Sequence, residues 1–327
     1  MSSTVLVTGA SGFLGLNLVE QLLGRGDTVI GVSHDRAPPD ALSDFAALPG
    51  RLVEIAADLT RPFDFASLIA THRVDTVING AAMTPGPGAD PRLARKVLDL
   101  NVVSSQRLLE AARDGGVTRF FQPSSTSIYG DAVFGDRPPG EDDPGAPDGL
   151  YAVSKYVVER LALSFGERYG MPVVAGRISS LFGPWERDTG VRDLLSPHLQ
   201  LVRLARAGVE AVLEPDAARD WSYARDVAKA MLCLTDQRAD GVALFNISCG
   251  ESWPFHRWAE RLAARRPGFR WRFAAPDEQS NIAYHGPRGR RRQPLDVGRL
   301  KACGAHDPIR SCDAALHDYA EWLETRG

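Results

Sequence analysis

The chain has few cysteines, and their spacing excludes the usual uses of paired thiols. They are Cys233, Cys249, Cys303 and Cys312, four in 327 residues. No two of them form a Cys-x-x-Cys pair. We therefore expect reduced, mostly structural thiols in a cytoplasmic protein, and no metal site.

The chain also lacks long apolar runs and a strong net charge. No hydrophobic stretch approaches the length of a membrane span, and the N-terminus leads directly into a short apolar strand, so neither a membrane span nor a signal peptide is expected. A formal net charge of −3 provides no basic field for nucleic acid. The one basic cluster, Arg288 with residues 290–292, is typical of a solvated loop.

Length and composition instead fit one large α/β domain, alone or with a smaller appendage. Of the 327 residues, 44% are hydrophobic and 24% are charged, which is ordinary for a globular protein. The chain shows no internal repeat and no long low-complexity tract.

A glycine-rich turn follows the first apolar segment. Residues 4–7 predict a short strand and residues 16–23 a helix, and Gly9, Gly12 and Gly15 lie between them. At Gly9 the chain can turn where a Cβ would clash, Gly12 admits a pyrophosphate to the backbone, and Gly15 lets the helix pack close to the strand. Because the N–H groups at the start of the helix face an anion favourably, this stretch predicts a dinucleotide-phosphate site.

The end of the second predicted strand, residues 27–33, bears on the choice of dinucleotide. In an NAD site an acidic side chain at this position holds the ribose hydroxyls, but the last strand residue here is Ser33. Ser33 with Arg36 suits a 2′-phosphate, whereas Asp35 would serve the ribose if the strand ran two residues further. The sequence leaves both open and leans slightly to NADP.

Two later strand ends carry residues suited to the rest of a dinucleotide. Asp58, after a strand at 51–56, can accept a hydrogen bond from an adenine amino group while Leu59 packs on the ring. Asp58 can equally cap a turn or a helix. After the next strand, Ala81 and Ala82 are small enough for a dinucleotide to lie close to the sheet.

A long helix is expected over residues 91–113, after a proline- and glycine-containing loop at 83–91. Asn101 lies in this helix among apolar neighbours, and a buried amide needs hydrogen-bond partners. It therefore serves either as a backbone brace or as part of a proton relay. A strand at 117–122 then leads into hydroxyl residues at 124–127, at a sheet edge where ligands bind.

Tyr151 and Lys155 lie four residues apart in a plainly helical segment, residues 151–161, and so share one helix face. An ammonium beside a phenol favours the phenolate and lowers its pKa. The pair therefore predicts an acid/base that works near neutral pH. Its order after a glycine-rich turn, an Asp-Leu pair and a hydroxyl cluster is more specific than the pair alone.

These motifs together resemble the extended short-chain dehydrogenases/reductases, in the NAD-dependent epimerase/dehydratase family with its UDP-galactose 4-epimerase-like enzymes. The resemblance rests on the glycine-rich turn, Asp58-Leu59, Ala81-Ala82, Asn101, residues 124–130, and Tyr151 with Lys155. It continues along most of the chain, at segments 171–177, 181–184, 218–228 and 245–250.

The resemblance implies an α/β fold with a doubly wound parallel sheet (Rossmann) and a smaller C-terminal substrate-binding lobe. Residues 1–178 and about 222–250 would form the NAD(P)-binding domain, and residues about 179–221 and 251–327 the lobe.

It also implies assembly. Members of this family usually dimerise as a four-helix bundle, here through the helices at 91–113 and 151–169, so a homodimer is expected.

The family further implies roles for residues at matching positions. Tyr151 would be the catalytic acid/base, Lys155 its tuner and a ribose contact, and Ser125 a hydrogen-bond partner of the reacting oxygen. The implied cofactor contacts are Gly9, Gly12, Phe13, Leu14, Gly15, Ser33, Arg36, Asp58, Leu59, Ala81, Ala82, Asn101, Tyr151 and Lys155. The implied substrate contacts are Thr84, Thr126, Ser180, Arg219 and Arg292.

The sequence departs from the family pattern at two places. Members that dehydrate sugars usually carry an acidic residue just after the Ser/Thr position, where this chain has Thr126 and Ser127, so 4,6-dehydratase chemistry is less expected. Many nucleotide-sugar enzymes have Asn where Ser180 stands, which weakens a nucleotide-sugar substrate without removing it. Arg219 and one arginine of 290–292 remain candidates for pairing with a diphosphate.

The function expected from this pattern is NAD(P)-dependent hydride transfer at a hydroxyl or keto carbon of a sugar, and specifically of a nucleotide sugar, as a 4-epimerase or a ketoreductase. The alternative is an NADPH-dependent reductase or dehydrogenase acting on a small non-nucleotide carbonyl compound. A non-catalytic dinucleotide sensor is a third hypothesis, against which the presence of Ser125, Tyr151 and Lys155 argues.

Overall fold

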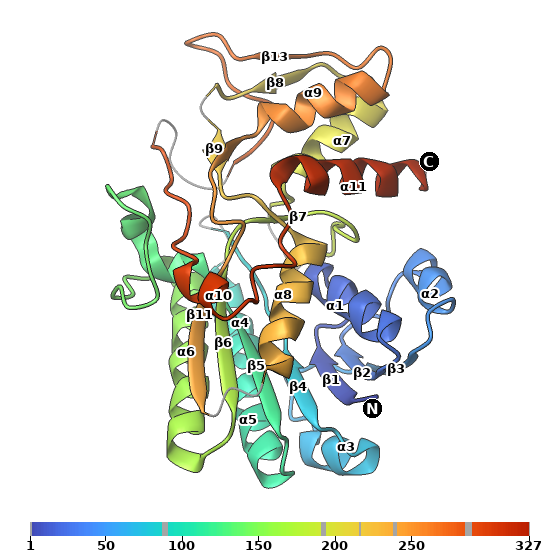
Figure 1. The fold of residues 1–327 in the computed structure, drawn as a ribbon, viewed down its shortest axis with the longest axis vertical. Helices are drawn as coiled ribbons and strands as arrows, with labels where there is room; N and C mark the ends of the chain where they lie inside the picture. The colour runs from blue at the N-terminus through green and yellow to red at the C-terminus, as the bar shows by residue number, and fades with distance from the viewer. Residues whose placement is uncertain are drawn as a thin grey trace.

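A seven-stranded parallel sheet forms the centre of the computed structural model, which describes residues 2–86, 91–190, 194–215, 217–237, 241–284 and 290–326 (Figure 1). The strand order is β11-β6-β5-β4-β1-β2-β3. The chain adds β2 and β3 on one side of β1 and then continues with β4 on the other side, while all strands stay parallel. This order confirms the predicted doubly wound fold class. The strands are β1 Thr4–Thr8, β2 Thr28–Ser33, β3 Arg51–Ala56, β4 Thr76–Asn79, β5 Arg119–Ser125, β6 Val173–Ile178 and β11 Val242–Ile247.

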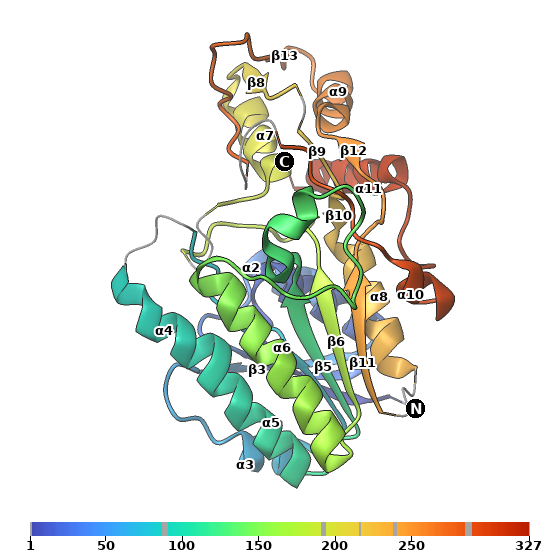
Figure 2. The same cartoon turned by 90° about the vertical axis from the view of Figure 1, so that its left-hand side faces the viewer.

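Helices cover both faces of this sheet, which explains the nearly continuous burial of β1, β4 and β6. One face carries α3, α5 and α6, and Figure 2 shows α4, α5 and α6 side by side on it. The other face carries α1 packed against α8. Their bounds are α1 Phe13–Gly24, α2 Pro39–Phe45, α3 Phe65–His72, α4 Ala94–Leu98, α5 Ser104–Asp114, α6 Gly149–Tyr169 and α8 Ala224–Asp236.

The helix expected over residues 91–113 forms, but it is not uniform. It begins with a 3₁₀ turn, Pro91–Leu93, and α4 and α5 are joined by a π-helical turn, Asp99–Val103. Asn101 lies in that π turn. Such turns are often found at functional sites.

A second hydrophobic cluster lies beyond the carboxyl ends of the strands, at the top of Figure 1. It is rich in stacked and edge-on aromatic rings, with Trp258 against Tyr319 and Phe182 against His198. Its elements are β7 Leu181–Phe182, α7 Pro197–Ala207, β8 Ala211–Leu213, β9 Ala218–Arg219, β10 Ser222–Tyr223, β12 Trp253–Pro254, α9 His256–Arg265, β13 Trp271–Phe273 and α11 Cys312–Glu324.

The short helix α10, Gly298–Ala302, lies near β11. Within the described ranges no helix is both long and apolar enough to cross a membrane. Those ranges also hold no group of three or more His, Cys, Asp or Glu side chains able to bind a metal ion. Arg288, in the predicted basic cluster, lies outside the described residues.

Candidate active site

The glycine-rich turn between β1 and α1 is shaped so that side chains would obstruct it. Gly9 has φ +69°, and a Cβ there would fall 2.9 Å from backbone atoms of Ala81. A Cβ on Gly15 would fall 2.0 Å from the Gly9 carbonyl oxygen, so Gly15 lets α1 approach the turn itself, whereas the sequence predicted close packing against the strand. The backbone is therefore open toward the start of α1, a cradle that fits a dinucleotide phosphate.

The end of β2 lies where the sequence placed it, at Ser33. The Ser33 Oγ accepts a hydrogen bond of 2.9 Å from the backbone N–H of Ser11, which ties β2 to the glycine-rich turn. Asp35 lies past the strand, and its exposed carboxylate contacts the His34 ring at 3.0 Å. The strand therefore does not run two residues further, which the ribose contact through Asp35 required.

Asp58 caps a turn after β3. Its Oδ1 accepts hydrogen bonds from the backbone N–H and the hydroxyl of Thr60, at 3.0 and 2.6 Å. These bonds, with the nearby charge of Arg61, lower the pKa of Asp58. Leu59 is buried in the core beside Phe65. The structure thus gives both residues a structural role, and their contacts with adenine remain a prediction.

Asn101 braces the loop after β4 against the helix that carries Tyr151. Its Oδ1 accepts from the Met83 N–H at 2.8 Å, and its Nδ2 donates to the Met83 carbonyl at 3.0 Å and to the Ser154 Oγ at 2.9 Å. An amide has two N–H donors, and both are used here. Of the two alternatives, the structure shows the brace.

The alanines predicted beside the dinucleotide lie next to the same turn. Ala81 donates its N–H to the Thr8 Oγ1 at 3.1 Å, and its backbone is what a side chain at Gly9 would strike. Ala82 and Thr84 are half-buried in the same segment. The segment at Ala81 therefore packs directly against the glycine-rich turn, in addition to its predicted place beside the dinucleotide.

Lys155 extends under the end of β5. Its Nζ donates to the Pro123 carbonyl at 2.5 Å, and burial lowers the pKa of Lys155 to about 8, against the opposing effect of Glu159. An ammonium has three donors, and Pro123 accepts one of them. Tyr151 lies one helical turn earlier on α6 and is half-buried.

Ser125 is the last residue of β5, close to the Pro123 carbonyl that anchors Lys155. Its Oγ accepts hydrogen bonds from the N–H and the hydroxyl of Ser127, at 3.2 and 3.0 Å. Neither Thr126 nor Ser127 supplies a carboxylate at this strand end. The structure therefore brings Ser125 and Lys155 to one end of β5, as predicted.

A buried ion pair lies behind these residues and was not predicted. The Arg177 guanidinium donates to Glu159 through Nη2 at 2.7 Å and Nε at 3.0 Å, and the side chains are 3% and 0% exposed. Glu159 also accepts from the Ser124 hydroxyl at 2.7 Å. Glu159 follows Lys155 by four residues, and this spacing was the one signal in the sequence.

Two arginines come together on the side of the second hydrophobic cluster. Arg292 donates from Nη2 to the Thr126 Oγ1 at 2.5 Å, while its buried Nε has no partner among the described residues. Burial, and to a smaller extent the charge of Arg292, lowers the pKa of Arg219 to about 10. Burial also lowers the pKa of Arg292, and the carboxylate of Asp220 opposes the lowering at each of the two arginines only in part. Two neighbouring cations suit an anionic ligand.

Ser180 contacts β10 through its backbone carbonyl. Its carbonyl accepts from the Ser222 N–H at 2.8 Å, at the junction of β7 and β10. The side chain is half-buried. Its contact with a substrate remains a prediction.

We expect Lys155→Met to lower turnover by about 10² and to weaken dinucleotide binding, because the predicted roles of the ammonium are to favour the Tyr151 phenolate and to supply donors to a ribose. Without that charge the phenolate forms only at higher pH, so the rising limb of the pH–rate profile should move upward. Steady-state kinetics between pH 6 and about 10 and a binding titration measure both effects. An unchanged profile with normal binding would assign Lys155 to packing alone.

The fold and this site define a class: a doubly wound dinucleotide-binding fold in which a tyrosine and a lysine lie one turn apart on helix α6. Residues 5–248 match the sequence model of the family described as "NAD dependent epimerase/dehydratase family". The chain belongs to this family, as its motifs predicted.

Curated relatives with similar sequences include enzymes that act on nucleotide sugars. A dTDP-glucose 4,6-dehydratase of Xanthomonas campestris is 25% identical over 99% of this chain and 93% of its own length. A UDP-glucose 4-epimerase of Erwinia amylovora is 26% identical over 76% of this chain and 79% of its own.

Among solved structures, MoeE5 in complex with UDP-glucose and NAD is 29% identical, with a TM-score of 0.73 over 99% of both chains. A UDP-glucuronic acid 4-epimerase of Bacillus cereus, solved with UDP-glucuronic acid and NAD, has a TM-score of 0.79 at 20% identity over 99% of this chain and 100% of its own. The second likeness supports the fold.

Proposed function

We propose that this enzyme transfers a hydride at a hydroxyl or keto carbon of a nucleotide sugar, as a 4-epimerase or a ketoreductase. The observation that carries the proposal is the placement of Lys155 at the end of β5 beside Ser125, one helical turn from Tyr151. The relatives and the neighbouring structures named above act on or bind nucleotide sugars, and they do not favour the small non-nucleotide carbonyl substrate.

Each residue of the proposed site has one role in the reaction. A nicotinamide ring, when bound, supplies the acceptor and donor of the hydride. Tyr151 takes the proton of the substrate hydroxyl, Lys155 favours its phenolate form, and Ser125 hydrogen-bonds the reacting oxygen. The glycine-rich turn holds the dinucleotide phosphates at the start of α1.

On the substrate side, Arg219 and Arg292 pair with the diphosphate, and Thr84, Thr126 and Ser180 line the sugar. In this proposal residues about 179–221 and 251–327 act as the lobe that covers the substrate, and residues 1–178 and about 222–250 as the domain that binds the dinucleotide. The second hydrophobic cluster provides the lobe with a core of its own.

Dehydration is the less favoured chemistry of this family for this chain. At the positions where sugar dehydratases usually carry an acid, Thr126 accepts a hydrogen bond from Arg292 and Ser127 donates to Ser125. A hydroxyl is a much weaker acid than a carboxyl group, so expulsion of a second hydroxyl has no obvious proton donor there.

A screen tests the proposed function. UDP-, dTDP- and GDP-sugars and small hydroxy-carbonyl compounds are incubated with both dinucleotides, and the products are identified by NMR. We expect a C4 epimer or a 4-keto/4-hydroxy interconversion of at least one nucleotide sugar. Turnover of small carbonyl compounds alone would contradict the nucleotide-sugar assignment.

NADP should bind at least as tightly as NAD. Ser33 stands where an acidic residue would repel a 2′-phosphate, and the exposed Arg36 is near enough in sequence to pair with one. Fluorescence titration of the purified enzyme with each dinucleotide measures the two dissociation constants. A strong preference for NAD would refute this expectation.

The enzyme should form a homodimer in the cytoplasm. Leu98 on α4 and Val153 and Val157 on α6 are 40, 41 and 42% exposed, and Figure 2 shows these helices side by side on the outer face of the molecule. Light scattering at micromolar concentration should give the mass of two chains. Val153→Glu with Val157→Glu should shift it to one, because charges would be buried in the bundle. A monomeric wild-type chain would contradict the proposal.

A further inference from the structure

The loop after β7 brings a guanidinium to the glycine-rich turn. The Arg187 Nη2 donates to the Ser11 carbonyl at 2.6 Å. The Arg187 Nη1 is buried and has no hydrogen-bond partner among the described residues. An unpaired buried donor on a charged group is costly, so Arg187 Nη1 calls for a partner that the described residues do not supply.

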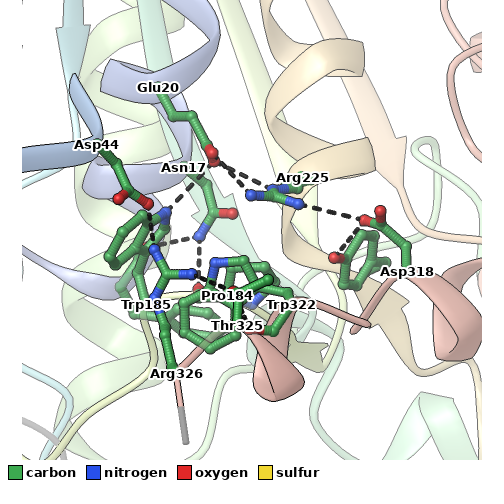
Figure 3. A network of polar contacts seen from close by, with 12 residues as sticks. Asn17, Glu20, Asp44, Pro184, Trp185, Arg225, Asp318, Trp322, Thr325 and Arg326 are labelled. Atoms are coloured by element: carbon green, nitrogen blue, oxygen red, sulfur yellow. Dashed lines mark hydrogen bonds and ion pairs between the residues drawn. The ribbon is translucent and has the colours of Figure 1, made fainter. Parts of the chain in front are cut away.

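This position is fixed by the first helix of the sheet domain. The Pro184 carbonyl accepts from the Asn17 Nδ2 at 2.9 Å, and the Trp185 Nε1 donates to the Glu20 Oε2 at 3.3 Å (Figure 3). Trp185 also has φ +68°, a left-handed conformation that few non-glycine residues adopt. Anchored on α1 at two points, the chain reaches Arg187 two residues later.

Trp322 on α11 and Arg326, just after that helix, pack against the same loop from the other side. The Arg326 guanidinium lies over the rings of Trp185 and Trp322, 4.5 and 4.2 Å from their centroids, and pairs with Asp44 (Figure 3). Glu20 also holds Arg225, which in turn contacts Asp318 on α11. The loop that carries Arg187 is therefore clamped between α1 and α11.

The surroundings of Arg187 belong to the adenosine end of a dinucleotide site. The negative charges of Asp40 and Asp35, both in the segment that follows β2, act to raise the pKa of Arg187. Burial nevertheless dominates and lowers the pKa of Arg187. Ser11, whose carbonyl accepts from Arg187, lines one small cavity whose other polar residues are Ser33, Asp35, Arg36 and Glu54.

We propose that Arg187 determines cofactor specificity by pairing with the phosphate on the adenosine ribose of NADP, together with Ser33 and Arg36. The proposal rests on the proposed function, in that the chain must bind such a dinucleotide. A guanidinium whose Nη2 is held by a hydrogen bond presents its Nη1 in a fixed direction, and a fixed N–H donor suits a phosphate oxygen. The shared pyrophosphate of NAD and NADP is assigned instead to Gly12 and the start of α1.

Binding measurements separate the two phosphates. Adenosine 2′,5′-bisphosphate and 5′-AMP, which differ only in the 2′-phosphate, are titrated by calorimetry into the wild-type enzyme, Arg187→Gln and Arg187→Lys, alongside NADP and NAD. Arg203→Gln is the matched control, since Arg203 is exposed on α7. Thermal unfolding of each variant verifies that it is folded.

Arg187→Gln should weaken the bisphosphate and NADP by about 10- to 100-fold and leave 5′-AMP and NAD within about threefold, as expected for a charged hydrogen bond. Arg187→Lys should fall between, and Arg203→Gln should match the wild type. Equal losses for all four ligands would move Arg187 to the pyrophosphate and overturn the proposal, and so would no loss at all. A wild-type enzyme that binds and uses NAD but not NADP would also overturn it while leaving hydride transfer intact. Failure to bind either dinucleotide would instead refute the proposed function.

Discussion

Turnover should fall by about 10²–10⁴ when Tyr151 is replaced by phenylalanine, while dinucleotide binding stays close to the wild type. The substitution keeps the ring and removes only the ionisable oxygen. A general acid/base contributes a rate factor of this size, and the loss should be larger still if proton and hydride transfer are tightly coupled. Single-turnover and steady-state kinetics on the best substrate measure the effect.

Tyr156→Phe provides the matched control for that experiment. Tyr156 lies on the same helix, half-buried, and its ring packs near Gly145 rather than at the end of β5. It should keep near wild-type turnover. If Tyr151→Phe did the same, the Tyr151–Lys155 pair would be a structural feature of α6 and the acid/base assignment would be wrong.

The second large effect concerns stability. Glu159→Gln should lower the free energy of unfolding by about 3–5 kcal/mol, because it leaves the Arg177 guanidinium charged and buried without its counter-ion. Urea denaturation monitored by fluorescence measures the loss. The end of β5 around Ser124 should also become more mobile, since Glu159 accepts a hydrogen bond from the Ser124 hydroxyl at 2.7 Å.

Glu321→Gln is the control for the buried pair. Glu321 contacts His317 at 3.0 Å on the exposed face of α11, and both side chains are more than half exposed. Exposed pairs contribute about 0–1 kcal/mol, so this variant should be nearly as stable as the wild type. Equal effects of the two substitutions would mean that the Glu159–Arg177 pair is open to water in solution.

The strands could be predicted where an apolar run is bounded by turn residues. β3 lies at the predicted position, 51–56, and β2 begins one residue after the predicted start at 27 and ends at the predicted residue 33. β5 runs to Ser125, past the predicted end at Gln122, because β6 pairs with it as far as Ser125, whereas β4 pairs with it only as far as Phe121. Beyond that point Pro123 costs the ladder little, and its carbonyl is available to Lys155.

The site could be predicted where local spacing carries it, and not where two distant segments meet. Tyr151, Lys155 and Ser125 follow from spacing and order along the chain. The pairing of Arg292 with Thr126 joins residues 166 apart, and that of Arg187 with Ser11 residues 176 apart. Neither segment contains a local pattern that identifies the other, so only the fold reveals these contacts.

The central claim is that this enzyme moves a hydride from a sugar carbon to the dinucleotide and does not exchange it with water. Nucleotide sugars carrying deuterium at C4 are incubated with the enzyme and each dinucleotide, and the products are examined by NMR and mass spectrometry. The account predicts that the deuterium stays at C4 of the epimer or is recovered on the dinucleotide, and that Tyr151→Phe abolishes both. Release of the deuterium into water, or no reaction of any nucleotide sugar with either dinucleotide, would contradict it.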